Sequence, residues 1–157
     1  MQPIVTGTEV TCNVDASFFR ECNHTGFGDC IRGVGGVFVK ELSGWVCNEM
    51  QVHEGEALAM LKAIEWLQQF KISSLTLFSD SKILVDAIHA KAEGLSGFNM
   101  IINHIRRCLE LQCNFEVKFI WRQANLVAHS LARVANSYAS HQVHDYVTPC
   151  ISSFIFI

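Results

Sequence analysis

The sequence predicts a single α/β domain built on a mixed β-sheet that is flanked by helices. Two observations predict this class: three strand-like segments near the N-terminus, and the alternation of helical and strand patterns after them. At 157 residues the chain fits one domain and can bury a full core. Hydrophobic residues make up 50% and charged residues 17%, which is typical of a globular protein.

The first three elements are expected to be strands. In residues 9–17 apolar and polar side chains alternate, which is the period of a strand with two different faces. Two more strands are expected over 26–32 and 36–42, and the sequence GVGG at 33–36 supplies the hairpin turn between them.

The clearest helix is expected over residues 54–70. Its apolar residues recur at helical spacing and predict a buried stripe: Ala57, Met60, Leu61, Ile64 and Leu67. Strands are then expected over 73–80 and 115–122, and helices over 81–90, 97–112 and 125–139.

The order β-β-β-α-β-α-α-β-α therefore predicts a five-stranded mixed sheet. Strands joined through helices should be parallel, so the first, fourth and fifth strands are expected to point the same way. Residues 1–8 are expected to form a short lead, 9–137 the domain and 138–157 an apolar tail.

The tail ends in the β-prone stretch CISSFIFI, which would invite aggregation if it stayed exposed. It is therefore expected to pack on the domain or against a protein partner. Three polar residues that precede it, His141, His144 and Asp145, are expected to be solvated.

Charge and cysteine content narrow the function classes. A net charge of −3 and a pI near 6.1 argue against a strongly basic nucleic-acid binder, although residues 101–135 hold five basic and two acidic side chains. Seven cysteines without paired spacing suit reduced, intracellular thiols, and Cys22, His24 and Cys30 lack the C-x2-C pair of a zinc site. Because no signal peptide or membrane-spanning run is visible, a soluble intracellular protein with no membrane partner is expected.

Three carboxylates stand at informative places. Asp15 lies near the end of the first strand, Asp80 ends the fourth strand, and Glu56 opens the helix between them. Functional groups gather at the carboxyl ends of strands in such sheets. Each residue also has an ordinary explanation: Asp80 could cap a helix, Glu56 could complement a helix dipole, and Asp15 could begin a turn.

Five segments, taken in order, resemble the type 1 ribonuclease H fold, and specifically the plant reverse-transcriptase-like domains descended from retroelements. They run from about residue 9 to 137 and are NVDASF, TGFGDCIR, EGEALAMLKAIEWL, LFSDSKILVDAI and WRQANLVAHSLARVA. The resemblance implies that Asp15, Glu56 and Asp80 are catalytic residues that bind a divalent metal, Mg²⁺ or alternatively Mn²⁺. Glu54 precedes the motif position and is expected to be an ordinary acid.

Elementary electrostatics agrees with a metal at these residues. Two carboxylates about 5 Å apart repel by roughly 3 kcal/mol at an effective dielectric near 20. Three together force a proton onto one member unless a cation lies among them, and Mg²⁺ prefers oxygen ligands.

The resemblance further implies hydrolysis of the RNA strand of RNA–DNA hybrids, with RNA distinguished through its 2′-hydroxyl groups. The partner would then be an RNA–DNA hybrid or another nucleic acid. Polar and basic side chains of the C-terminal half are expected to contact it: Arg106, Arg107, Lys118, Arg122 and Asn125.

The last motif departs from the family. Its members carry Asn, three residues, a metal-binding Asp and then Leu-Ala, whereas NLVAHSLA keeps Asn125 and places His129 at the position of the Asp. The flexible His-containing loop and the basic handle helix of some relatives are also missing. His129 is either the remnant of a decayed site or a working group, as a proton donor or a ligand for a softer ion.

Three functions therefore stay open. They are a metal-dependent hybrid ribonuclease, an inactive nucleic-acid-binding domain that keeps the fold, and a protein-interaction module that uses the apolar C-terminus. The three carboxylates favour the first, whereas the acidic pI and His129 favour the other two.

Overall fold

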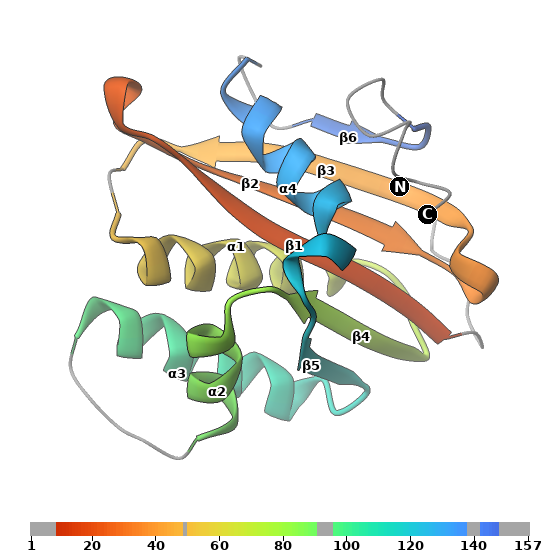
Figure 1. The fold of residues 1–157 in the computed structure, drawn as a ribbon. Helices are drawn as coiled ribbons and strands as arrows, with labels where there is room; N and C mark the ends of the chain where they lie inside the picture. Colours follow the sequence, from red (N-terminus) through yellow and green to blue (C-terminus); the bar gives the residue numbers. More distant parts are fainter. Residues whose placement is uncertain (1–8, 49, 91–95, 138–141, 148–157) are drawn as a thin grey trace.

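The computed structural model describes residues 9–48, 50–90, 96–137 and 142–147. Within these residues lies a six-stranded sheet of order β5-β4-β1-β2-β3-β6 (Figure 1). Its strands are β1 (Glu9–Phe19), β2 (His24–Arg32), β3 (Phe38–Val46), β4 (Ser74–Ser79), β5 (Phe115–Phe119) and β6 (Gln142–His144). The helices are α1 (Val52–Leu67), α2 (Lys82–His89), α3 (Gly97–Leu111) and α4 (Leu126–Val134).

The strand directions confirm the predicted mixed sheet. β4 runs parallel to both β1 and β5, while β2 is antiparallel to β1 and to β3. A short 3-10 turn, Val34–Gly36, joins β2 to β3 where the glycine-rich hairpin turn was expected. The last helix is shorter than predicted, because α4 ends at Val134 and a 3-10 turn, Ala135–Ser137, follows it.

The prediction of five strands was wrong by one, because β6 adds an edge strand antiparallel to β3. His144 of β6 is not solvated as expected: its Nδ1 lies 3.2 Å from the buried Glu41 Oε1. Next to it, exposed Asp145 pairs with Lys40. The boundary at residue 137 stays a prediction, and His141 and the stretch CISSFIFI lie outside the described residues.

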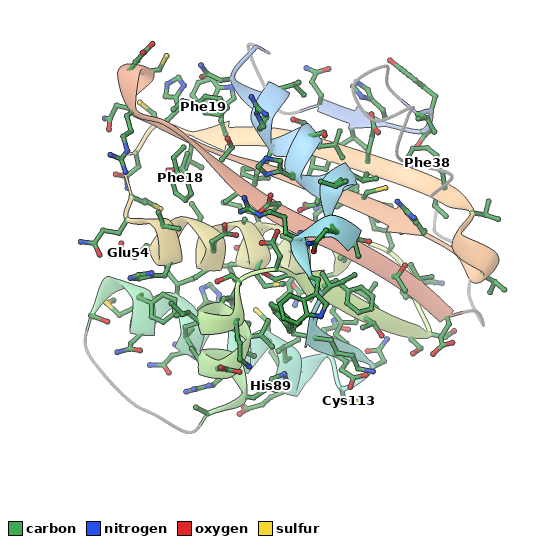
Figure 2. The ribbon with its side chains drawn as sticks, viewed as in Figure 1. Phe18, Phe19, Phe38, Glu54, His89 and Cys113 are labelled. Atoms are coloured by element: carbon green, nitrogen blue, oxygen red, sulfur yellow. The ribbon has the colours of Figure 1, made fainter. Side chains whose placement is uncertain are left out.

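The sheet is covered differently on its two faces. Val10, Cys12 and Val14 of β1 point into the main hydrophobic core with α1, α2 and α3, whereas Asn13 and Asp15 point to the face that α4 crosses (Figure 1). On the core side, His89 ends α2, and its Nε2 lies 2.8 Å from the carbonyl oxygen of Val117 on β5 (Figure 2). No helix in the described part of the chain is long and apolar enough to cross a membrane.

Two glycines let helices approach the sheet closely. A Cβ at Gly28 would lie 2.4 Å from the Ala132 nitrogen, so only glycine lets α4 lie this close to β2. Gly28 pairs with Asp15 across the β1–β2 ladder, which brings α4 over that carboxylate. A Cβ at Gly55 would similarly lie 2.3 Å from the Phe18 ring, so glycine there lets the start of α1 pack against β1 (Figure 2).

Candidate metal centre

Three carboxylates meet where the parallel strands β1 and β4 separate. The pairing of these strands ends at Val14 and Ser79, and Asp15 and Asp80 follow directly. Glu56 reaches the same point from the second turn of α1. One ligand oxygen from each carboxylate lies within 4.8 Å of the other two. The structure therefore brings together the three acidic residues that the sequence singled out.

The surroundings make three negative charges costly. Burial, and then the charge of Asp80, raises the pKa of Asp15 to about 6, although a hydrogen bond from His129 opposes the rise. Burial, and then the charges of Asp15 and Asp80, raises the pKa of Glu56 to about 9. Without a cation, the site therefore favours a protonated Glu56 at neutral pH.

The donor atoms fit a hard divalent cation. Asp15 Oδ1 and Asp80 Oδ2 are buried and accept no hydrogen bond from the described residues, although Arg122 Nε lies 3.5 Å from Asp80 Oδ2. Buried carboxylate oxygens without a hydrogen-bond donor are costly, and an ion such as Mg²⁺ or Mn²⁺ would satisfy them. Glu54 is not in the cluster: it lies two residues earlier, in the first turn of α1, beside Gly97 (Figure 2).

His129 belongs to the same site. It lies on α4 over Gly28, and its Nδ1 is 2.7 Å from Asp15 Oδ2. Its side chain is 28% exposed, whereas that of Asp15 is 1% exposed, so the imidazole lies between the buried carboxylate and the surface. His129, at the position where the sequence motif expects a fourth carboxylate, thus makes a polar contact with Asp15.

Asn125 and Arg122 hold the strand-to-helix segment before α4 against the site. Asn125 Nδ2 donates to the carbonyl oxygen of Val14, and Asn125 Oδ1 accepts from Asn13. Because Asn125 is fully buried, its role in this structure is to position β1 against α4. Arg122 Nε lies 3.5 Å from Asp80 Oδ2, and its side chain is 67% exposed beside the carboxylates.

The other predicted nucleic-acid contacts do not gather at one place. The Arg106 guanidinium donates to main-chain carbonyls of Ala87, Ile88 and Ala90, so it caps the end of α2. Arg107 is exposed on α3, and Lys118 is exposed on β5. Nucleic-acid contacts by these residues stay a prediction.

An exposed aromatic residue, not among the predicted site residues, directly precedes Arg122 in the chain. Trp121 is 73% exposed, and its ring meets the Phe119 ring edge-on at 5.2 Å between centroids. Lys82 Nζ lies 5.8 Å from the centre of the Phe119 ring. The sequence did contain a signal for an exposed Trp121. The residue stands next to Arg122 in WRQAN, just beyond the end of a strand, where an apolar side chain has few core residues to pack against.

Comparisons with known proteins agree with this fold. Residues 13–135 match the family described as "Reverse transcriptase-like". The fold is similar to RNase H1 from the halophilic archaeon Halobacterium salinarum, with a TM-score of 0.68 and 18% identity over 82% of this chain and 98% of that chain. An N-terminal RNase H domain from Mycobacterium tuberculosis has a TM-score of 0.70 and 13% identity over 83% and 95%.

A third similar structure is LC11-RNase H1, isolated from compost and solved in complex with an RNA/DNA hybrid. Its TM-score is 0.70 at 19% identity, over 80% of this chain and 95% of that chain. No curated protein is similar to the chain in sequence.

The sheet order, the crossing of α4 and the likeness to these structures show the fold of a type 1 ribonuclease H-like domain. More particularly, the chain belongs to the reverse transcriptase-like family, which spans most of its length. The resemblance seen in the five sequence motifs is thereby confirmed.

Proposed function

We propose that the chain hydrolyses the RNA strand of RNA–DNA hybrids with the help of a divalent metal ion. The observation that carries this proposal is the meeting of Asp15, Glu56 and Asp80 at the carboxyl ends of parallel strands in a ribonuclease H-like sheet. LC11-RNase H1, which shares the fold, binds an RNA/DNA hybrid in its crystal structure, and that supports the choice of substrate.

Each polar group at the site has a distinct role in this proposal. Asp15, Glu56 and Asp80 would hold Mg²⁺ or Mn²⁺, which supplies Lewis-acid chemistry at a phosphodiester. His129 hydrogen-bonds to Asp15 Oδ2, so Asp15 Oδ1 is the carboxylate oxygen that is available to a metal ion. Arg122 restrains Asp80 and, being largely exposed, can donate to a substrate phosphate. Contacts to the 2′-hydroxyl would distinguish RNA from DNA.

A cleavage assay tests the proposal. A hybrid carrying one label on its RNA and another on its DNA is incubated with the wild type, Asp15→Asn and Asp86→Asn, in Mg²⁺ and separately in Mn²⁺. We expect the wild type to cut only the RNA. Asp15→Asn should cleave more than about a hundredfold more slowly, because a few kcal/mol of transition-state stabilisation would be lost. Asp86 is exposed on α2 and serves as the matched control.

A second candidate function is a nucleic-acid-binding domain that no longer cleaves. The observation that favours it is His129, an imidazole at the position of a fourth carboxylate and 2.7 Å from Asp15. Hybrid binding without cleavage in either metal would support this function and contradict the first.

A further inference from the structure

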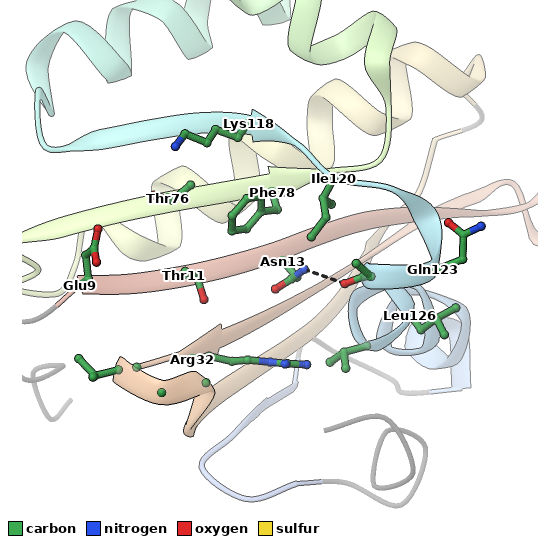
Figure 3. A pocket seen from close by; sticks show the side chains of 16 residues that line it. Glu9, Thr11, Asn13, Arg32, Thr76, Phe78, Lys118, Ile120, Gln123 and Leu126 are labelled. Carbon is green, nitrogen blue, oxygen red and sulfur yellow. Dashed lines mark hydrogen bonds between the residues drawn. The ribbon is translucent and has the colours of Figure 1, made fainter. Parts of the chain in front are cut away.

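A groove on the α4 face of the sheet combines an apolar lining with several polar side chains. A groove of about 770 Å³ runs across β5, β4, β1 and β2 beside the start of α4 (Figure 3). Strand pairing aligns two rows of side chains on this face. One row is Lys118, Phe78 and Asn13, and the other contains Thr76, Thr11 and Arg32. The hairpin turn at residues 33–36 closes one end.

Arg32 is the unusual member of this groove. Its side chain extends along the groove towards α4, and its Nε is buried without a hydrogen-bond partner among the described residues (Figure 3). The guanidinium also lies beside the Cys30 thiol, which is a weak partner for a cation. The side chain as a whole is half-buried, but its Nε–H is a buried donor of a cationic group and has no acceptor among the described residues, which favours the binding of an anion in the groove.

The other lining groups suit a nucleotide rather than a bare anion. Lys118 adds a second cation on β5, and within the described part of the chain its ion pair is an exposed one with Glu116 at 3.7 Å. Thr11 and Thr76 supply hydroxyl groups, and the Phe78 ring supplies an apolar surface among them (Figure 3). The remaining acidic group, Glu9, is exposed at the N-terminal end of β1.

The groove adjoins the carboxylate cluster. Asn13 lines the groove two residues before Asp15 on the same face of β1, which places their Cα atoms roughly 7 Å apart. The segment between β5 and α4 borders both sites, since Gln123 lines the groove and Arg122 reaches Asp80. A strand that passes the carboxylates could therefore continue into the groove.

We propose that this groove is a second nucleic-acid subsite that holds one nucleotide unit, with its phosphate on Arg32 and Lys118 and its base or sugar against Phe78. The unit is either a free mononucleotide or part of a strand that also crosses the carboxylate site. The strand form of the proposal rests on the proposed function, whereas the nucleotide chemistry rests on the groove alone.

Nuclear magnetic resonance of the metal-free, 157-residue chain tests this directly, because the Nε–H group of an arginine gives its own signal. Three probes are titrated: inorganic phosphate, adenosine monophosphate and a 5′-phosphorylated pentanucleotide. We expect the Arg32 Nε–H signal to shift on addition of the mononucleotide, the pentanucleotide or both. A response to the mononucleotide indicates a free-nucleotide site, and a response to the pentanucleotide alone indicates a strand subsite.

Variants assign the binding to the groove. Arg32→Gln should weaken binding of the responding probe by about tenfold, the usual scale of a charge-assisted hydrogen bond. Arg20→Gln, at the opposite end of β2 in the exposed turn Arg20–Cys22, should leave it unchanged. Lys118→Gln changes an exposed side chain that the fold does not need, and should weaken binding about threefold even if Arg32→Gln fails to fold.

An Arg32 signal that stays fixed with all three probes would overturn the proposal. So would probe binding that neither Arg32→Gln nor Lys118→Gln weakens. Because no metal and no cleavage enter the measurement, a chain that proves inactive on hybrids can still pass it. Conversely, an active chain can fail it, which separates this proposal from the proposed function.

Discussion

At the scale of single residues, His129 decides how the metal centre would work. The imidazole contacts Asp15 Oδ2 at 2.7 Å, and this hydrogen bond lowers the pKa of Asp15 against the effects of burial and of Asp80. It thus helps to keep Asp15 ionised. Unlike a carboxylate, however, a neutral imidazole adds no negative charge and is a poor ligand for Mg²⁺.

Replacing His129 by Asp should therefore restore a fourth carboxylate. We expect His129→Asp to raise Mg²⁺-dependent cleavage of an RNA–DNA hybrid by about tenfold or more, because a second ion gains a hard oxygen ligand. His129→Asn, which has a similar size to Asp and no charge, should give no such gain. A rate for His129→Asp below that of the wild type would show instead that the imidazole itself takes part in the reaction.

Trp121 offers an exposed aromatic surface one residue before Arg122, which reaches Asp80, and the Trp121 side chain is 73% exposed. Stacking of one base on an aromatic ring contributes about 1–3 kcal/mol. Trp121→Ala should thus weaken hybrid binding by about tenfold, measured by fluorescence anisotropy in an Asp15→Asn background without metal. Trp121→Phe should keep most of the affinity, and Leu111→Ala, at a residue 84% exposed on α3, should keep all of it. Equal affinities for Trp121→Ala and the wild type would remove Trp121 from the interface.

At the scale of elements, β2 carries an acid that the proposed reaction does not use. Asp29 is fully buried on the core face of the sheet, where it pairs with Val14 and Leu42 across the ladders. Neither of its carboxylate oxygens has a hydrogen-bond partner among the described residues. Burial raises the pKa of Asp29 well above its usual value, so the folded state holds this proton more tightly than the unfolded state does.

The sign of the resulting pH dependence follows from linkage. Below the unfolded pKa of about 3.9 both states are protonated and no stability is lost, whereas at higher pH ionisation favours the unfolded chain. Asp29→Asn should therefore raise the melting temperature more at pH 8 than at pH 5, while Asp86→Asn on exposed α2 should not. A gain that is equal at both pH values would mean that Asp29 does not titrate with unfolding.

At the scale of the whole molecule, local patterns were enough to predict most of the fold. Strand alternation in 9–17 and the apolar stripe of α1 predicted their elements because both patterns arise from a face that is buried. β6 was missed because a three-residue edge strand carries no period, and its pairing with β3 is a long-range contact. The stretch CISSFIFI has a stronger strand propensity than residues 142–144, so the sequence favours a strand there and not at β6.

The site was predictable in part for a similar reason. Asp15 and Asp80 lie at the same end of the sheet because β1 and β4 are parallel neighbours, a relation that the element order implies. The burial of Asn125, the capping of α2 by Arg106 and the orphan Nε of Arg32 depend on how side chains pack in three dimensions. No spacing along the sequence encodes these contacts, so the sequence could not show which of these polar side chains pack against the protein and which lie on its surface.

The central claim is that Asp15, Glu56 and Asp80 form one divalent-cation site, and thermal unfolding with and without Mg²⁺ tests it most directly. An ion at a hundred times its Kd stabilises the folded state by about 2.7 kcal/mol, and 1 kcal/mol raises the melting temperature by roughly 2–4 °C in a domain of this size. At ionic strength matched with NaCl, we expect such an increment for the wild type. Asp80→Asn should melt at or above the wild-type temperature without Mg²⁺, because repulsion is relieved, and should lose the increment. An equal increment in both proteins, or none in the wild type, would contradict the three-carboxylate site.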